Sequence, residues 1–238
     1  MEIAAGMKRF YEDVSVREAE GGWRVFLDER PIRTPGGKAQ IVPSEPLAQA
    51  LAAEWARQGD EIDLTAFVLR DLADYALDTV AADRAATIDD LLSYAQTDTL
   101  CYRGDEGEPL YLRQLEVWEP LLSAAETRYG IGFERVSGIV HRPQGDALIA
   151  RLRAELEAKD AFTLAALRML AGLAASLVIG LAALEPDADP VALWNAANLE
   201  EDWQADLWGR DAEADAARET RYAAFETAMR FARLARAA

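Results

Sequence analysis

The sequence predicts an α+β protein: a small N-terminal antiparallel β domain at residues 1–43, then a larger α-helical domain at residues 44–238. Three observations lead to this class. Short aromatic and β-branched runs alternate with glycine and proline turns only before residue 43. Beyond Ser44, apolar residues recur at the spacing of one helical face. The chain contains no internal repeat and no low-complexity linker.

The N-terminal domain is expected to form an antiparallel meander or a small barrel. Its strands are predicted at residues 10–16, 23–27, 32–34 and 39–42. Turns are predicted at residues 20–22, 28–31 and 35–38, where glycine, proline or acidic residues cluster. Strands that follow one another this closely favour hairpin connections within a single sheet.

The remaining chain is expected to be helical, with capping residues marking several ends. Ser44 is a predicted N-cap, and Gly59 is a predicted stop signal. Asp189 and Pro190 form a cap and first-turn pair. Helices are predicted at residues 44–59, from 70, from 87, at 109–129, 146–159 and 190–209, and from 211 to the end. Residues 131–142 are expected to be extended or irregular.

One apolar run, Phe162 to Leu184, approaches the length of a membrane-spanning helix. Arg168 lies inside it, and Gly172 and Gly180 weaken its continuity. The flanks, Lys159-Asp160 and Glu185-Pro186-Asp187, show no basic anchor on one side of the run. We therefore expect one buried helix, or two helices joined near Gly172, and no membrane insertion.

The charge balance excludes several classes of partner. The chain has 42 acidic and 25 basic residues, a net charge of −17 and a pI of about 4.5. A surface of this sign repels nucleic acids and anionic lipid headgroups. It would attract basic partners, but high net charge is also typical of proteins that simply remain dispersed in water.

Cysteine usage and the N-terminal residues predict a cytoplasmic location. Cys101 is the only cysteine, so no internal disulfide forms, which is typical of a reducing compartment. Residues 1–7 lack the basic and apolar regions of a signal peptide and the arginines of a transit peptide.

No catalytic residue, metal ligand or cofactor is expected. Cys101 and the only histidine, His141, are isolated, whereas nucleophilic and zinc sites gather several such residues. The glycine pairs at residues 21–22 and 36–37 are hairpin turns and lack the context of a phosphate-binding loop.

The acidic segment Glu200-Glu201-Asp202, with Asp206, is the nearest approach to a chemical site. At about 100° per residue, its carboxylates point in different directions around one helix. They therefore do not converge on a metal ion or form a catalytic pair. The alternative interpretation is a carboxylate-dependent small-molecule hydrolase, which would require a deep pocket lined by these acids.

Tryptophans lie on both sides of the same predicted helix. Trp194, Glu201 and Trp208 lie near one stripe, and Trp203 lies on a stripe roughly opposite. One side must cover the core. The other side either exposes aromatic residues to a partner, or is also buried, with Glu201 paired to an internal arginine.

Several motifs, in this order, resemble one known family: the assembly chaperones of the F-type ATP synthase catalytic head, in the branch that handles the alpha subunit. These motifs are Leu27-Asp28-Glu29-Arg30-Pro31-Ile32-Arg33-Thr34-Pro35, Glu54-Trp55-x-x-Gln58, Thr97-Asp98-Thr99-Leu100-Cys101-Tyr102-Arg103, Trp118-Glu119-Pro120, Arg128-Tyr129-Gly130 and Leu199-Glu200-Glu201-Asp202-Trp203-Gln204. The resemblance extends from Phe10 to about Gly209.

The resemblance implies a β domain joined to a helical domain and a chaperone that neither uses nucleotide nor catalyses a reaction. Its expected partner is the unassembled ATP synthase alpha subunit, whose subunit interface it would shield against aggregation. The expected partner-binding residues are Glu200, Glu201, Trp203, Gln204, Trp208 and Trp194. We expect a monomer, and a bacterial relative of a mitochondrial family.

Overall fold

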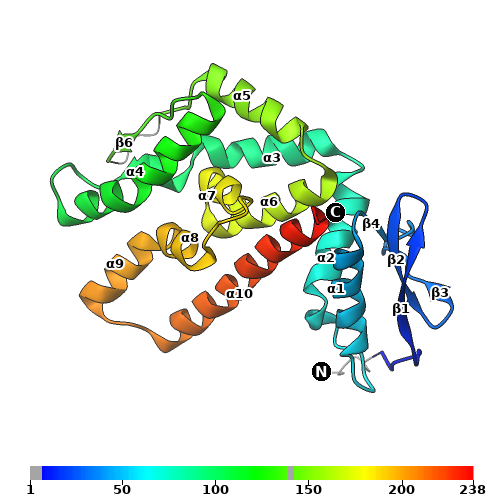
Figure 1. Ribbon diagram of the computed structural model, residues 1–238. Coiled ribbons are helices and arrows are strands. Elements are labelled where there is room, and N and C mark those ends of the chain that lie inside the picture. The colour runs from blue at the N-terminus through cyan, green and yellow to red at the C-terminus, as the bar shows by residue number, and fades with distance from the viewer. Residues whose placement is uncertain (1–6, 139–141, 238) are drawn as a thin grey trace. The chain divides into compact units, whose positions relative to one another are not determined.

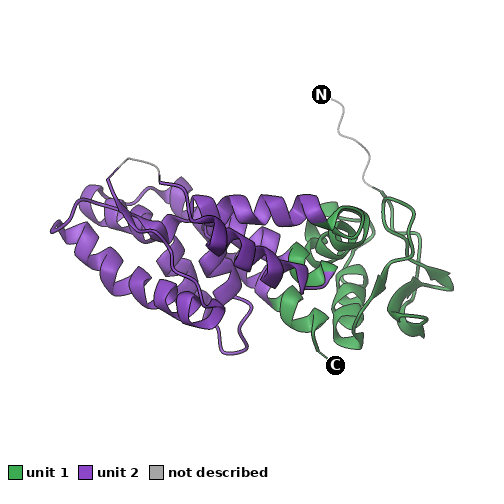
Figure 2. Ribbon diagram, turned by 90° about the horizontal axis from the view of Figure 1, so that it is seen from above, with its two compact units in different colours: residues 1–84, 161–165, 230–238 green, residues 85–160, 166–229 purple. Residues whose placement is uncertain are grey.

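The computed structural model describes residues 7–138 and 142–237. The chain divides into two compact units (Figure 2). Unit 1 contains Met1–Arg84, Ala161–Ala165 and Arg230–Ala238, and unit 2 contains Ala85–Asp160 and Ala166–Met229. This grouping differs from the domain boundary expected between residues 43 and 44, because the first helix packs on the sheet. The two-domain division of the sequence stays a prediction.

The sheet of unit 1 is antiparallel, as predicted (Figure 1). Its strands are β1 (Val14–Ala19), β2 (Gly22–Leu27), β3 (Arg30–Pro31) and β4 (Ile41–Val42). β2 pairs with β1 through a tight hairpin. On its other edge, β2 pairs with β3 near residue 26 and with β4 near residue 23. The N-terminal part of the chain therefore has the predicted sheet.

Several strand boundaries differ from the prediction, and Asp28 explains the start of β1. The Asp28 carboxylate accepts backbone hydrogen bonds from Glu12 at 3.0 Å and Asp13 at 2.9 Å. These bonds hold residues 12–13 outside the ladder, so β1 begins at Val14 and not at residue 10. The next turn is shorter than predicted, so β3 forms at Arg30–Pro31 and not at residues 32–34.

Short helices complete the N-terminal part of unit 1. They are α1 (Glu45–Ala56), η1 (Leu64–Ala66), α2 (Val68–Tyr75) and the π-helical turn η2 (Ala76–Val80). Ser44 caps α1, as predicted, by accepting the Leu47 N–H at 3.2 Å. Leu47, Leu51 and Trp55 are buried residues of α1, which packs against β1 and β2.

Unit 2 is mainly helical, and α6 and α10 contribute residues to both units. Its elements are α3 (Arg84–Gln96), η3 (Thr99–Cys101), β5 (Tyr102–Arg103), α4 (Pro109–Tyr129), β6 (Val136–Ser137), α5 (Asp146–Glu157), α6 (Ala161–Ala174), α7 (Leu177–Ala182), α8 (Pro190–Ala197), α9 (Leu199–Trp208) and α10 (Ala212–Ala235). The bounds of α4 match the prediction, with Gly130 ending it in the left-handed region at φ 64°.

The apolar run from residue 162 forms two helices, α6 and α7, which is one of the two expected arrangements, and they join at residues 175–176, just beyond Gly172. The helix is interrupted at Ala175, which has φ 47°. The Ser176 side chain caps α7 by accepting a hydrogen bond from the Ile179 N–H. A Cβ atom at Gly172 would lie 2.8 Å from the Arg168 guanidinium, so glycine permits close packing there. Within the described ranges, no helix has both the length and the apolar character needed to cross a bilayer.

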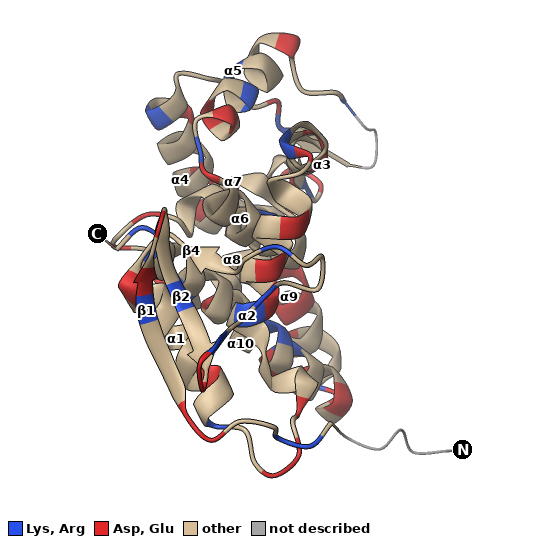
Figure 3. Cartoon of the chain, turned by 90° about the vertical axis from the view of Figure 1, so that its right-hand side faces the viewer, with Lys and Arg blue, Asp and Glu red and all other residues tan. Residues whose placement is uncertain are grey.

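Acidic and basic residues are spread over both units (Figure 3). The isolated histidine singled out in the sequence, His141, lies outside the described residues.

Candidate functional site

The acidic-aromatic segment begins at a break between two helices. One helix was predicted across residues 190–209, but α8 ends at Ala197 and α9 begins at Leu199. Asn198 lies between them with φ −107° and ψ 18°, and its side chain donates to the Trp194 carbonyl at 2.8 Å. The prediction of a single helix is therefore wrong at this point. The predicted helical face that joined Trp194 to Trp208 does not continue through the break.

Two side chains of α4 hold this corner. The buried Trp118 indole donates to the Ala196 carbonyl at 2.8 Å, so that carbonyl has a partner outside the helix. Gln114, one turn earlier on α4, donates to the Glu200 carboxylate at 2.6 Å. The start of α9 is thereby positioned by a distant part of the sequence.

The three consecutive acids point to three different partners. Glu200 contacts Gln114, Glu201 pairs with Arg221 at 3.1 Å, and Asp202 makes a two-pronged pair with Arg218. Loss of surrounding water raises the pKa of Glu200, and the hydrogen bond from Gln114 opposes that shift. The predicted divergence of these carboxylates is confirmed.

The C-terminal half of α9 presents apolar side chains to solvent. Trp208 is 81% exposed and Leu207 is 62% exposed. Trp203 is half-buried, and Gln204 is exposed. We call these four residues, Trp203, Gln204, Leu207 and Trp208, the α9 surface. Large exposed aromatic side chains are characteristic of protein-binding surfaces.

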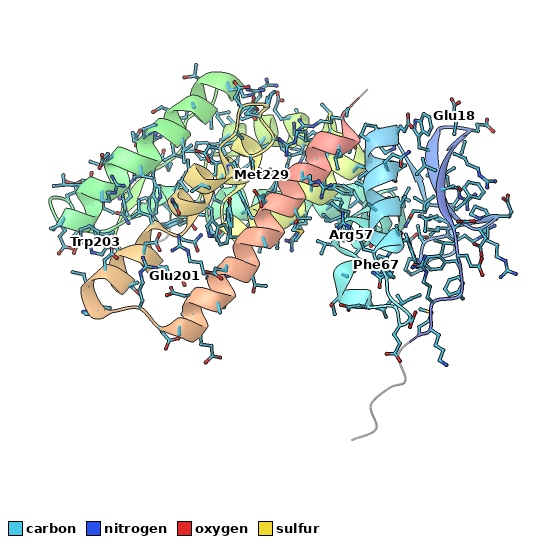
Figure 4. All side chains as sticks on the ribbon, turned by 60° about the horizontal axis from the view of Figure 1, so that its bottom comes forward. Glu18, Arg57, Phe67, Glu201, Trp203 and Met229 are labelled. Carbon is cyan, nitrogen blue, oxygen red and sulfur yellow. The ribbon has the colours of Figure 1, made fainter. Side chains whose placement is uncertain are left out.

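Clefts lie on both sides of α9. Toward α4, a cleft of about 560 Å³ is lined by Trp203, Val117 and Arg113, among others. Toward α10, a smaller one of about 220 Å³ is lined by Gln204, Trp208 and Arg218, among others. Glu201 points from α9 toward α10, and Trp203 lies on the opposite side of the helix (Figure 4).

Trp194 is placed differently from the other predicted site residues. It is only 3% exposed and packs against Tyr222 and Phe225, with ring centroids 6.1 and 5.5 Å away. Its edge lines a cleft of about 350 Å³ with Val191 and Tyr222. Trp194 thus supports α8 against α10, and its contact with a partner stays a prediction.

Sequence reasoning did not single out Arg218, Arg221 or Leu207. The two arginines lie three positions apart on α10, a spacing that places them on one helical face. Their acidic partners are about twenty residues earlier, so no local pattern joins the two groups. Leu207 adjoins Trp208 in the sequence, and that apolar pair in an acidic segment was an available signal.

The described residues do not provide an obvious catalytic centre. Burial raises the pKa of the Cys101 thiol to about 12, which leaves it protonated and unreactive at neutral pH. In the described part of the chain, no group of three or more His, Cys, Asp or Glu side chains is arranged to hold a metal ion. An exposed aromatic helix beside separately paired carboxylates is instead typical of polypeptide-binding proteins.

Comparisons with known proteins place the chain in a family. The model of the family described as ATP12 chaperone protein matches residues 8–126. The mitochondrial protein atp12 of Schizosaccharomyces pombe is 24% identical over 218 residues, covering 85% of this chain and 74% of that protein. The chain belongs to the ATP12 chaperone family.

Solved bacterial structures extend the likeness to nearly the whole chain. Atp12 of Paracoccus denitrificans is 38% identical and superposes with a TM-score of 0.91, covering 97% of this chain and 99% of that one. A point mutant of the same protein gives the same TM-score and identity, with 97% and 98% covered.

Membership of this family settles the class of function. ATP12 proteins are non-catalytic assembly chaperones of the F1-ATPase alpha subunit. The expected assembly role is therefore confirmed, and the carboxylate-dependent hydrolase interpretation is wrong.

Proposed function

We propose that this chaperone binds the unassembled alpha subunit through the α9 surface and covers an apolar face that a neighbouring subunit later occupies. The observation that carries the proposal is the exposure of Leu207 and Trp208, at 62% and 81%, on a helix whose first turn is held by the hydrogen bond from Gln114 to Glu200. A fixed helix loses little freedom when its exposed side chains are covered, so more of the contact energy remains as affinity.

The acidic half of α9 would orient the client. Glu201 and its partner Arg221 are both about half exposed, at 48% and 43% of the side chain, so a client group can reach either charge. Charges at the edge of an interface mainly set register and the rate of encounter. Glu200, Glu201, Trp203, Gln204 and Trp208 are thus proposed as contacts.

Binding and release require no nucleotide hydrolysis in this scheme. The chaperone holds the alpha subunit by mass action, and a subunit of higher affinity displaces it. The net charge of −17 keeps the complex from associating with further copies. We propose that the protein acts as a monomer in the bacterial cytoplasm, as the absence of disulfides and the likeness to bacterial proteins suggest.

The test is suppression of aggregation of isolated alpha subunit in the absence of nucleotide. We expect wild type to suppress light scattering at equimolar concentration, and the Trp208→Ala variant to bind at least tenfold more weakly, because exposed aromatic anchors contribute about 2 kcal/mol or more at interfaces.

Leu112→Ser is the matched control. Leu112 is 57% exposed on α4 and lies about 160° around that helix from Gln114, which contacts α9. The Leu112→Ser variant should bind the alpha subunit as tightly as wild type does. Equal affinity of Trp208→Ala and wild type would refute the proposed binding surface, and failure of wild type to bind would refute the function itself.

A further inference from the structure

Unit 1 contains a groove that the α9 surface does not explain. Its volume is about 430 Å³. Two motifs singled out in the sequence meet there, because the groove is lined by Leu27, by residues 30–35 and by Trp55. Phe10, Leu64, Arg70 and Asp74 complete it.

The groove has an apolar rim and an aromatic floor. Phe10 and Leu64, both at the rim, are 58% and 54% exposed. Trp55 is 7% exposed and packs between Tyr11 and Phe67, with ring centroids 5.6 and 4.4 Å away. Such a surface favours apolar side chains over water.

Its charge is opposite to that of the whole protein. Arg30, Arg33 and Arg70 line the groove, against one acid, Asp74. Asp74 accepts a hydrogen bond from Gln40 at 2.6 Å and lies 4.0 Å from Arg70, and burial raises the pKa of its carboxyl group. The groove is therefore a positive site in a chain of net charge −17.

Two of these arginines are available to a ligand. Arg70 pairs with Asp71 at 2.6 Å and lies over the Phe67 ring at 3.8 Å. Arg33 donates to the neutral Gly37 carbonyl. Among the described residues, neither Arg30 nor Arg33 has a carboxylate within ion-pair distance. After the backbone hydrogen bonds of residues 12 and 13, the charge of Arg30 also lowers the pKa of Asp28, but Arg30 makes no direct ion pair with that carboxylate. Its guanidinium can therefore still bind the carboxylate of a ligand.

The backbone of the groove limits how a ligand is held. Pro31 and Pro35 have no N–H, so this edge cannot extend regular strand pairing to an added strand. Recognition must then rest on side chains: a carboxylate for the arginines and an apolar group for the aromatic floor.

We propose that this groove binds a segment of the client polypeptide in which an acidic residue adjoins one or two large apolar residues. The identity of that polypeptide, the alpha subunit, rests on the proposed function. The groove gives the chaperone a second contact that selects by sequence, whereas the α9 surface covers an apolar face.

The experiment combines charge reversal with site-specific cross-linking on the full chain and isolated alpha subunit. We expect Arg30→Glu to weaken binding about tenfold at low salt, and less at high salt, where charge interactions are screened. Arg17→Glu is the control, since Arg17 is exposed, lies in the same unit, changes the net charge equally and is outside the groove. The affinity of the Arg17→Glu variant for the alpha subunit should remain within about twofold of that of wild type.

A photoreactive phenylalanine analogue at Phe10 identifies the occupant. We expect a cross-link to an alpha-subunit peptide with an Asp or Glu within about three residues of an apolar attachment point. If wild type binds the alpha subunit but neither the cross-link nor the Arg30→Glu effect is seen, the groove proposal is wrong and the proposed function stands. A cross-link between two copies of this chain would also overturn it. If wild type does not bind the alpha subunit, both proposals fail.

Discussion

Two helix junctions in unit 2 are similar in form, but the helices that follow them differ in exposure. α6 gives way to α7 at residues 175–176, and α8 gives way to α9 at Asn198. Every residue of α7 from Leu177 to Leu181 is buried, whereas Leu199 is the one buried residue of α9. A broken helix is therefore not itself a sign of a binding site. Exposure of the helix that follows the break distinguishes α9, the proposed binding helix, from α7.

A fully buried side chain from far along the sequence contacts each junction. Asp98, which is fully buried, accepts the Val178 N–H at 2.9 Å and the Leu100 N–H at 3.1 Å. Trp118, also fully buried, donates to the Ala196 carbonyl. The first anchor buries a carboxyl group and the second buries an indole, so the two junctions should respond differently to mutation and to pH.

The largest expected effect is at the α8–α9 junction. Trp118→Ala should lower the free energy of unfolding by about 3–5 kcal/mol, because it leaves a large cavity and an unpaired carbonyl at Ala196. Chemical denaturation measures this loss. Trp118→Phe is the control that keeps a ring, and it should cost less than the alanine variant. Similar stability of the alanine variant and wild type would show that α4 does not hold this corner.

The second effect is a pH dependence at the α6–α7 junction. Burial raises the pKa of Asp98 to about 6, from an ordinary 3.8, although backbone hydrogen bonds oppose the shift. Between these values the folded state holds the proton and the unfolded chain releases it. The contribution of Asp98 to the free energy of unfolding is therefore present at low pH and is lost as pH rises through about 6.

Urea unfolding of wild type and Asp98→Asn between pH 4 and pH 7 tests this expectation. The stability of wild type relative to the variant should fall by about 2–3 kcal/mol over that range, since asparagine does not titrate. A difference that is constant with pH, or that grows as pH rises, would mean that Asp98 is ionised throughout.

The two junctions also show where sequence patterns were no longer sufficient to predict the helix boundaries. The bounds of α4 and the caps at Ser44 and Asp189 were predictable, because caps and periodicity act within a few residues. The break at Asn198 was missed, since its anchor Trp118 is eighty positions earlier. The junction near Gly172 was located only approximately, because glycine also allows close packing, and the neighbours Arg168 and Tyr94 of Gly172 were not apparent from the sequence.

The candidate site was predictable to a similar extent. The acidic-aromatic segment was identified from its residues, and the divergence of its carboxylates followed from helix geometry. Which tryptophan is exposed was not predictable, because the break changes the rotation of α9 relative to α8. Trp194 faces Phe225, and Trp208 faces solvent.

A third, smaller effect concerns the ion pair that ties α9 to α10. Asp202 and Arg218 are partly buried, with side chains 28% and 17% exposed, and two hydrogen bonds join them. A double-mutant cycle with Asp202→Asn and Arg218→Gln should give a coupling of about 1–2 kcal/mol in unfolding free energy. Additive single effects would show that the pair does not position α9.

The smallest effect is expected at the neighbouring pair, Glu201 with Arg221. Both side chains are about half exposed and lie 3.1 Å apart, a setting in which ion pairs contribute about 0–1 kcal/mol. Glu201→Gln should therefore change unfolding free energy by less than about 0.5 kcal/mol, while lowering affinity for the alpha subunit severalfold if the client uses this carboxylate. Because the fold is barely affected, the binding measurement then reports the contact itself. Unchanged affinity would restrict the binding role of α9 to its apolar half, at Leu207 and Trp208.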